Sequence, residues 1–367
     1  LVTRSRKKSS SDHVAKIGIW ERWSGFALNR PGPALLAGLA LLLALVVPAL
    51  GMKLGMPDAR VVEEGRSSRD GFEMLVSAFG EGAAAPIYVI TPAQSAGEIT
   101  ALAAGMDGAA GARIVTPPNA ADRVVIQVTP SAAAGDASTT HLIDTLRDEP
   151  RATAPARLVG GPAAQSHDLT AVLTGRAPYA IGIIMLGALI MLLVIFRSLV
   201  IAVSSVLLNL LSVAAAFGFA TLLFQHGFGV GLIGVEHQGF VDAWAPIFFF
   251  ALLFGLSMDY QLFLLAAIRE RYDVHGNTQA AVREALGRTS RPITNAALIM
   301  IVVVIAFGVT GSITPTELGL TLAFAVLLDA TLIRMLLMPA IMSLLGERNW
   351  WLPGWLDRIL PNITFRH

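Results

Sequence analysis

The sequence contains no cysteine. This absence excludes disulfides, thiolate metal sites and a cysteine nucleophile, although it does not fix the cellular compartment. Charge is also scarce, because Asp, Glu, Lys and Arg make up 14% of the 367 residues, against about 25% in a typical soluble domain. The 27 basic and 26 acidic residues nearly balance, and the basic residues are scattered along the chain. No nucleic-acid partner is therefore predicted.

The scarce charge is distributed unevenly. Long stretches contain no charged residue, whereas others resemble ordinary soluble protein. A helix that crosses a membrane needs about 20 mostly apolar residues. The stretches that meet this requirement lie at 34–50, 178–196, 199–224, 244–268, 296–311 and 317–345. The pattern predicts an α-helical integral membrane protein with six transmembrane helices, and a secretory signal at the first stretch is the less favoured alternative.

Lys and Arg in the short connections indicate the orientation, because basic loops stay on the cytoplasmic side. The N-terminal segment, the tight link at Arg197, the 269–291 link and the C-terminal tail are basic, whereas the 225–243 and 312–316 links have no Lys or Arg. With six spans, all the basic segments lie on one face. Both termini are therefore predicted to be cytoplasmic, in a multi-pass protein of the cell membrane.

The resulting organisation is one span, a large insert and then five spans. The predicted parts are a cytoplasmic N-terminal segment (1–33), a first transmembrane helix (34–56), an extracytoplasmic domain (57–176), a five-helix transmembrane bundle (177–345) and a cytoplasmic tail (346–367).

The 57–176 insert is charged, rich in Ala and interrupted by Gly and Pro. Helical patterns at 67–79, 95–106 and 137–148 alternate with strand patterns at 85–90, 113–116, 123–129 and 156–159. Ser95 and Glu98 match a capping box at the start of the second helix. The alternation predicts a small α+β domain. His141 and His167 are isolated, and no metal-ligand cluster, phosphate loop or catalytic triad spacing occurs, so neither a cofactor nor an enzymatic activity is predicted.

Asp259 and Tyr260 are the most informative residues of the fourth span. Asp259 is 15 residues into this span, or roughly 22 Å below its outer end. An aspartate at that depth costs about 2.5–3.5 kcal/mol on insertion scales and persists only where it faces protein or water. Tyr260 adds a hydroxyl that can donate to a carboxylate. We expect Asp259 to be buried beside a neighbouring helix, which Gly255 and Ala251 on its face allow to approach closely.

Further polar residues lie at similar depth in other spans. Asp329 and Arg334 in the sixth span are roughly 18 Å and 25 Å deep, on either side of the level of Asp259. Arg334 could pair with either aspartate or extend toward the cytoplasmic face. A helix-fixing ion pair and a direct role in transport both remain open for these two residues. For Asn209 and Ser212 in the third span, ordinary helix packing is the favoured interpretation.

Several motifs resemble those of the MMPL group of transporters, in the RND superfamily. The resemblance lies in Gly-Leu-Ser-Met-Asp-Tyr at 255–260, Ile-Arg-Glu-Arg-Tyr at 268–272, Ala-Val-Arg-Glu-Ala-Leu at 281–286, Arg-Pro-Ile-Thr at 291–294, Leu-Asp-Ala-Thr-Leu-Ile-Arg at 328–334 and Asn-Trp-Trp-Leu-Pro at 349–353. The one-plus-five layout with a porter-like external domain also matches. Such transporters contain two copies of this unit, and this sequence holds one, which most resembles the second.

The resemblance implies export of lipids or other hydrophobic molecules across the inner membrane, driven by the proton-motive force. Asp259 and Tyr260 would be half of a proton relay, and the facing Asp-Tyr pair would come from a second repeat in the same longer chain or in a partner chain. Gln261 stands where relatives often have an acid. Two alternatives remain open: a subunit similar to SecD or SecF that assists protein export, and a membrane scaffold or sensor that does not transport.

Overall fold

The computed structural model describes residues 25–115, 122–148, 158–232, 237–308 and 312–361. Within them are six helices long and apolar enough to cross a membrane, which confirms the predicted number of spans. The predicted features at residues 1–24, including most of the N-terminal segment, lie outside the described ranges. The spanning helices are α2 (Pro31–Val46), α6 (Pro162–Phe196), α7 (Leu199–Ala220), α8 (Ala245–His275), α9 (Thr278–Gly308) and α10 (Ile313–Leu328).

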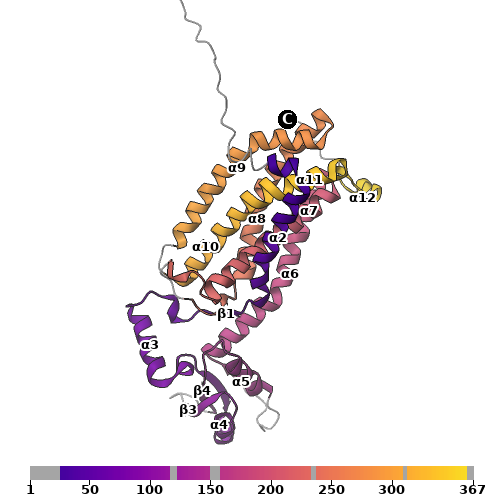
Figure 1. The fold of residues 1–367 in the computed structure, drawn as a ribbon. Coiled ribbons are helices and arrows are strands. Elements are labelled where there is room, and N and C mark those ends of the chain that lie inside the picture. The colour runs from indigo at the N-terminus through magenta and orange to yellow at the C-terminus, as the bar shows by residue number, and fades with distance from the viewer. Residues whose placement is uncertain (1–24, 116–121, 149–157, 233–236, 309–311, 362–367) are drawn as a thin grey trace, which may run out of the picture.

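The last span continues beyond α10 without a break. It passes through a π-helix, η7 (Asp329–Leu337), into α11 (Met338–Leu345). The short helix α12 (Gly354–Ile359) follows at the end of the bundle far from the strands (Figure 1). A single cluster of buried apolar side chains runs through all the spanning helices and holds the bundle together.

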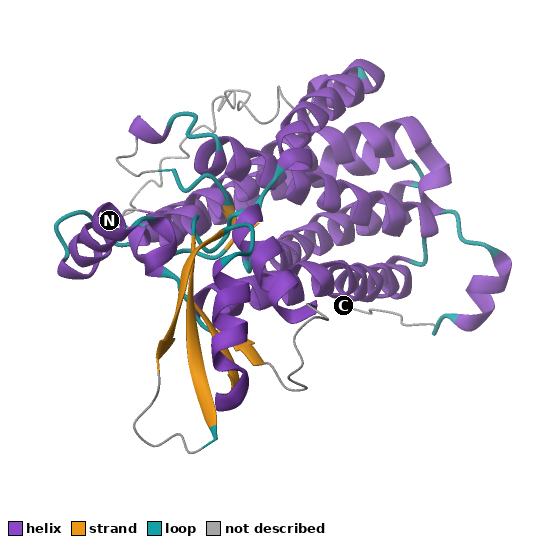
Figure 2. Cartoon of the chain, turned by 90° about the horizontal axis from the view of Figure 1, so that it is seen from below, coloured by secondary structure: helices purple, strands orange, loops and turns teal. Residues whose placement is uncertain are grey.

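Residues between α2 and α6 build a separate layer. Its antiparallel sheet has the strand order β3-β4-β2-β5. The strands are β2 (Ile87–Pro92), β3 (Ala109–Val115), β4 (Arg123–Pro130) and β5 (Leu158–Gly160), and the helices are α3 (Ser67–Phe79), α4 (Ala96–Ala104) and α5 (Ala137–Asp148). Apolar residues of α4 and α5 pack with alternate residues of β2 and β4 in a second core. The strands gather at one end of the molecule, below the packed helices (Figure 2).

The predicted helices at 67–79 and 137–148 are confirmed to the residue. Ser95 is the N-cap of α4, as predicted, but its side chain makes no capping hydrogen bond. The second span was expected to begin at Pro178, but α6 is continuous from Pro162 through Pro178. Hydropathy detects only the apolar half of this helix, so the polar half that belongs to the sheet layer was missed.

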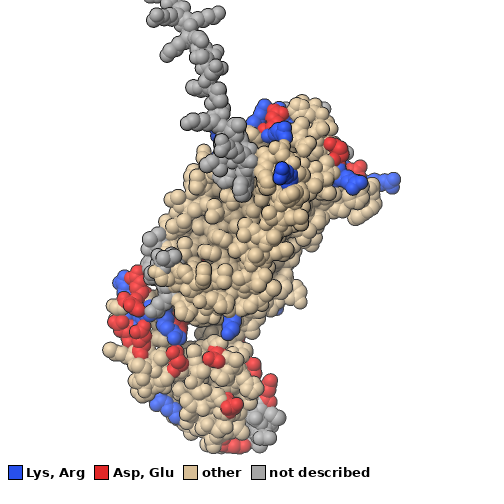
Figure 3. Space-filling view, in the orientation of Figure 1, with Lys and Arg blue, Asp and Glu red and all other residues tan. Residues whose placement is uncertain are grey.

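A short parallel pair of strands joins the two layers. β1 (Leu54–Gly55) follows α2, and β6 (Val241–Asp242) precedes α8. The backbone N–H of Val241 donates to the Lys53 carbonyl at 2.9 Å. On the face seen in Figure 3, charged side chains gather at the two ends of the molecule and leave an uncharged band over the helices. The chain is a multi-pass membrane protein, since this band coincides with the six apolar helices.

Candidate functional site

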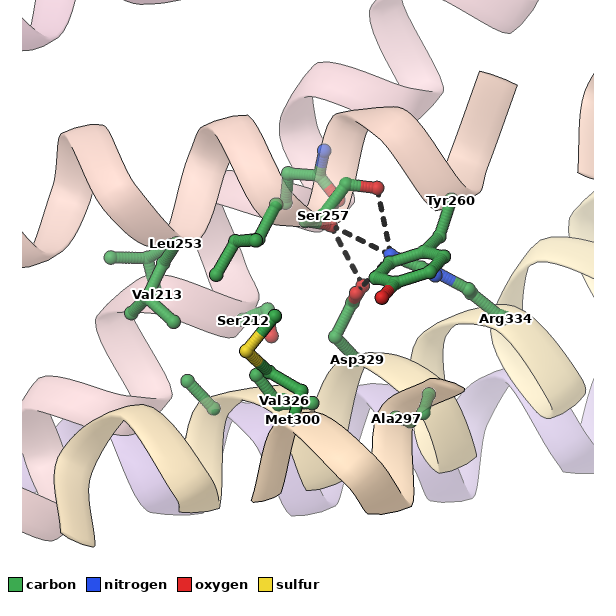
Figure 4. Close-up of a pocket in the computed structure, with 14 residues that line it drawn as sticks. Ser212, Val213, Leu253, Ser257, Tyr260, Ala297, Met300, Val326, Asp329 and Arg334 are labelled. Carbon is green, nitrogen blue, oxygen red and sulfur yellow. Dashed lines mark hydrogen bonds and ion pairs between the residues drawn. The ribbon is translucent and has the colours of Figure 1, made fainter. Parts of the chain in front are cut away.

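A buried polar cluster occupies the middle of the bundle, where α7, α8 and the last span meet. Asp329 forms an ion pair with Arg334. The other Asp329 oxygen accepts a hydrogen bond from the Ser257 hydroxyl at 2.9 Å. Arg334 also donates to the Ser257 carbonyl oxygen at 2.7 Å. In Figure 4 these three side chains point toward one another, with the Tyr260 ring beside them.

The π-helix explains why Asp329 and Arg334 meet. The two residues are five apart, and i and i+5 lie on different faces of an α-helix. In a π-helix the backbone bonds join residues five apart, so that i and i+5 come together. The last span changes to this geometry at Asp329 and keeps it to Leu337. The helix therefore supplies both members of the ion pair itself, and other helices only have to cover it.

The cluster extends to Asn209 on α7 and to Tyr260 on α8. The Ser257 hydroxyl oxygen lies 2.9 Å from Asn209 Oδ1, and the Arg334 guanidinium lies 5.0 Å from the centre of the Tyr260 ring, which is a cation–π contact. A hydroxyl has only one proton to donate. Asn209 Nδ2 has no hydrogen-bond partner among the described residues. If the Asn209 amide is turned by 180°, its NH₂ group donates to the Ser257 hydroxyl oxygen, while the Ser257 hydroxyl donates to Asp329.

These polar groups are shielded from solvent. Asp329, Arg334 and Asn209 have 8%, 2% and 1% of their surfaces exposed. Breaking a buried ion pair by removing one member costs about 3–5 kcal/mol, so the stability of the bundle depends on both residues. A small cavity beside the pair is large enough for water. It is lined by Asn209, Ser212, Leu253, Ser257, Tyr260, Ala297, Met300, Asp329 and Arg334, among others.

Asp259 does not belong to this cluster, which differs from the expectation of a buried Asp259. Its side chain is exposed on the outer face of α8, whereas Tyr260, about 100° further round the helix, is half-buried and contacts Arg334. The Asp259 side chain makes no hydrogen bond or ion pair with any described residue. Gly255 and Ala251 share its face and are exposed as well, and a Cβ added at Gly255 would meet nothing within 4 Å. The close approach expected at this face therefore has no partner within the described chain.

Two further residues of the cluster, Arg334 and Ser257, bear on the expectations from the sequence. Of the two aspartates considered for Arg334, the structure pairs it with Asp329. Ser257 contacts every polar member of the cluster except Tyr260, but sequence analysis gave it no role. A usable signal was present, because Ser257 precedes Tyr260 by three residues and so shares its side of α8.

Two other buried polar sites were also missed. Gln261 is 2% exposed, and neither of its amide atoms has a partner among the described residues. Glu317 and Asp242, to which the sequence analysis gave no role, are 1% and 0% exposed. In the described ranges, no group of three or more His, Asp or Glu side chains could hold a metal ion.

Comparison with known proteins gives a consistent family match. The model of the MMPL family matches residues 89–363. The mycolic acid-containing lipids exporter MmpL11 of Mycolicibacterium smegmatis is 36% identical over 96% of this chain and 38% of its own length. The heme uptake protein MmpL11 of Mycobacterium tuberculosis H37Rv is 35% identical over 100% of this chain and 39% of its own length. The chain thus spans less than half the length of these relatives.

Among solved structures, SecDF in its super-membrane-facing form aligns with a TM-score of 0.42 and 16% identity. The alignment covers 90% of this chain and 39% of SecDF. A match at this level supports no conclusion about function.

Proposed function

The chain belongs to the MMPL family of the RND superfamily, and from that premise we propose that it is one half of a proton-driven exporter of lipids or other hydrophobic molecules. The observation that carries the proposal is the arrangement of α8. This helix presents Asp259 on an open face and, one residue later, directs Tyr260 to the buried Asp329–Arg334 pair. An open carboxylate and the ring that contacts the buried ion pair thus come from neighbouring residues of one helix.

The open face of α8 calls for a second unit. An ionisable side chain at bilayer depth normally faces protein or water, and small residues such as Gly255 and Ala251 let another helix approach closely. We propose that a second repeat, in the same longer chain or in a partner chain, covers this face and supplies a facing Asp-Tyr pair. The coverage of less than two fifths of the MmpL11 relatives is consistent with a partner of similar size.

A proton at Asp329 would rearrange the cluster. The ionised carboxylate accepts from Ser257 and balances the charge of Arg334. A protonated Asp329 carries its own donor and no negative charge, so Arg334 would lose its counter-ion while it keeps its contacts with Ser257 and the Tyr260 ring. The guanidinium would then be free to stabilise another carboxylate. Proton binding would in this way change which groups Arg334 holds together, as proton-coupled transport requires.

The proposed orientation places the sheet layer outside the cytoplasm. It follows from the basic links at the opposite end of the bundle and from the charge-free band between the two ends (Figure 3). Both termini would then be cytoplasmic. Membrane lipids would surround the apolar helices, whose outer surfaces include Leu36, Ile183, Ile299 and Val302 at 66–72% exposure.

A hydrophobic substrate fits the surface of the sheet layer. A hollow between α3 and the sheet is lined by Leu75, Phe79, Ala112, Arg113, Gln127 and Thr129, among others. Phe79 beside it is 73% exposed. The relatives are named for mycolic acid-containing lipids and for heme, which are both large and partly apolar. We propose an amphiphile of this kind as the substrate.

The experiment that tests transport uses the complete protein encoded by the reading frame, in liposomes loaded with fluorescent lipid analogues of different headgroups. An imposed pH gradient should drive net movement of at least one analogue, and a protonophore should abolish it. Movement of the lipid analogue that continues in the presence of the protonophore would show that transport is not coupled to protons. If no analogue moves and the protein instead copurifies with a protein-export channel, the SecD/SecF alternative would replace the proposal. A scaffold or sensor predicts neither lipid movement nor copurification with an export channel.

A further inference from the structure

Two acids are buried together where the sheet layer joins the bundle. Asp242 is the last residue of β6, and Glu317 lies in the second turn of α10. Their exposed fractions are 0% and 1%. The backbone N–H of Asp242 donates to Glu317 Oε1 at 3.3 Å, and the Trp244 indole N–H donates to Asp242 Oδ2 at 3.2 Å. One oxygen of each carboxyl is thus used.

The other two oxygens remain without partners. Asp242 Oδ1 and Glu317 Oε2 are inaccessible and accept no hydrogen bond within the described chain. The nearby Thr314 hydroxyl and Gln238 amide nitrogen are also without a hydrogen-bond partner there. Neither acid forms an ion pair with a described residue. The elements that contact β6 or α10 carry or adjoin other titratable side chains, among them Lys53 before β1, His226 after α7, Asp259 and Tyr260 on α8, and Asp329 and Arg334 on η7. None of them forms an ion pair with Asp242 or Glu317.

Two ionised carboxylates could not share this place without compensation. A buried charge without a counter-ion is strongly unfavourable, and a like charge nearby adds to the penalty. Burial raises the pKa of the Asp242 carboxyl, and the hydrogen bond from the Trp244 indole only partly offsets this effect. No cationic side chain among the described residues forms an ion pair with either acid, so the simplest compensation is a proton.

We propose that Asp242 and Glu317 form a proton-binding carboxyl pair at this joint, separate from the cluster around Asp329. One proton leaves the pair with a single negative charge and a hydroxyl donor. That donor can satisfy an acceptor that is now unpartnered. Such a pair titrates as a unit, so the bound proton belongs to both residues.

The pair is placed to control how the sheet layer is attached. The backbone N–H of Ala243, next to Asp242, donates to the Gly55 carbonyl at 2.8 Å, and the Gln225 side chain accepts from the Lys53 N–H at 2.7 Å. For an acid whose pKa is raised by folding, the neutral form is favoured in the folded state. The joint is therefore most stable at low pH and weakens as the pH rises through the pKa of the pair. Acid outside the cytoplasm would hold the joint closed.

The test is infrared difference spectroscopy of the full chain in liposomes, recorded during pH steps. The C=O stretch of a protonated carboxyl should be present at neutral pH and disappear on raising the pH. The band of this pair is identified as the one lost in both Glu317→Gln and Asp242→Asn. It should persist in Asp329→Asn, which alters the other buried carboxyl, and in Asp107→Asn, which alters an exposed one.

Three results would overturn the proposal. The first is a wild-type spectrum with no band that Glu317→Gln and Asp242→Asn both remove. The second is a band that titrates only in the range of an ordinary exposed carboxyl. The third is loss of the band at neutral pH when Na⁺ or Ca²⁺ replaces a large organic cation in the buffer at constant ionic strength. That result would mean that a metal cation, and not a proton, occupies the pair. Because the spectrum detects protonation and not transport, its outcome is independent of the proposed export function.

Discussion

Asp329 and Arg334 form an ion pair within one membrane-spanning helix, across five residues that a π-helix brings together. Ser257 on α8 binds both members of the pair, through its hydroxyl and its carbonyl oxygen. The last span and α8 are thereby fixed to each other in the middle of the bundle. Substitutions in this contact between Ser257 and the Asp329–Arg334 pair should change the stability of the bundle and its response to protons to different extents, depending on which atom is removed.

Replacing Ser257 by Ala should destabilise the bundle by about 1–3 kcal/mol, because Asp329 and Asn209 each lose a buried hydrogen-bond partner. The measurement is the free energy of unfolding of the purified chain in mixed micelles. Ser204→Ala is the matched control, since the Ser204 hydroxyl donates to the Val200 carbonyl of its own helix at 2.7 Å. Equal small losses in the two variants would show that the Ser257 contacts carry no stability.

Removing Arg334 should cost more than removing the whole pair. Arg334→Met leaves the Asp329 charge buried without a partner, with an expected loss of about 3–5 kcal/mol. Adding Asp329→Asn removes that charge and should restore part of the loss. A double-mutant cycle on unfolding free energies measures the coupling, expected in the range of about 0.5–3 kcal/mol. Additive effects would mean that the ion pair does not stabilise the fold.

The absence of cysteine makes the orientation simple to test, because each single-cysteine variant carries one thiol. Asp107→Cys lies in the sheet layer, and Ala280→Cys lies near the start of α9 at the opposite end of the bundle (Figure 1). A membrane-impermeant maleimide should label Asp107→Cys in intact cells and Ala280→Cys only after permeabilisation. The reverse pattern would place the sheet layer in the cytoplasm.

The sequence alone was sufficient for the spans and their number. Apolar runs as long as 199–224 have no stable place in a soluble domain of this composition. Each of the six helices contains most of one such run, although α6 and α9 begin well before theirs. The two helices predicted to the residue, α3 and α5, begin after non-helical segments and have an apolar face that a periodic pattern detects.

The arrangement of the site was harder to predict. Depth along a helix is readable from residue counts, but the direction of a side chain requires the local helix type. The switch to π-helix at Asp329 brings Arg334 round to it, and no pattern in single residues signals such a switch. Sequence reasoning also took the cost of a buried charge as a reason to place Asp259 inside this chain. Asp259 is instead exposed on α8, so the described part of the chain does not itself meet this cost.

If the chain is half of a proton-driven exporter, we propose that the Asp259 carboxyl, beside Tyr260, carries protons during transport. The most direct measurement is substrate-dependent proton movement into liposomes containing the complete protein and a trapped pH indicator, with Asp259→Asn compared with Glu270→Gln. Glu270 lies on the same helix but is exposed at its end. The account predicts that Asp259→Asn abolishes the substrate-dependent pH change while Glu270→Gln retains it. An undiminished pH change in Asp259→Asn would contradict the account.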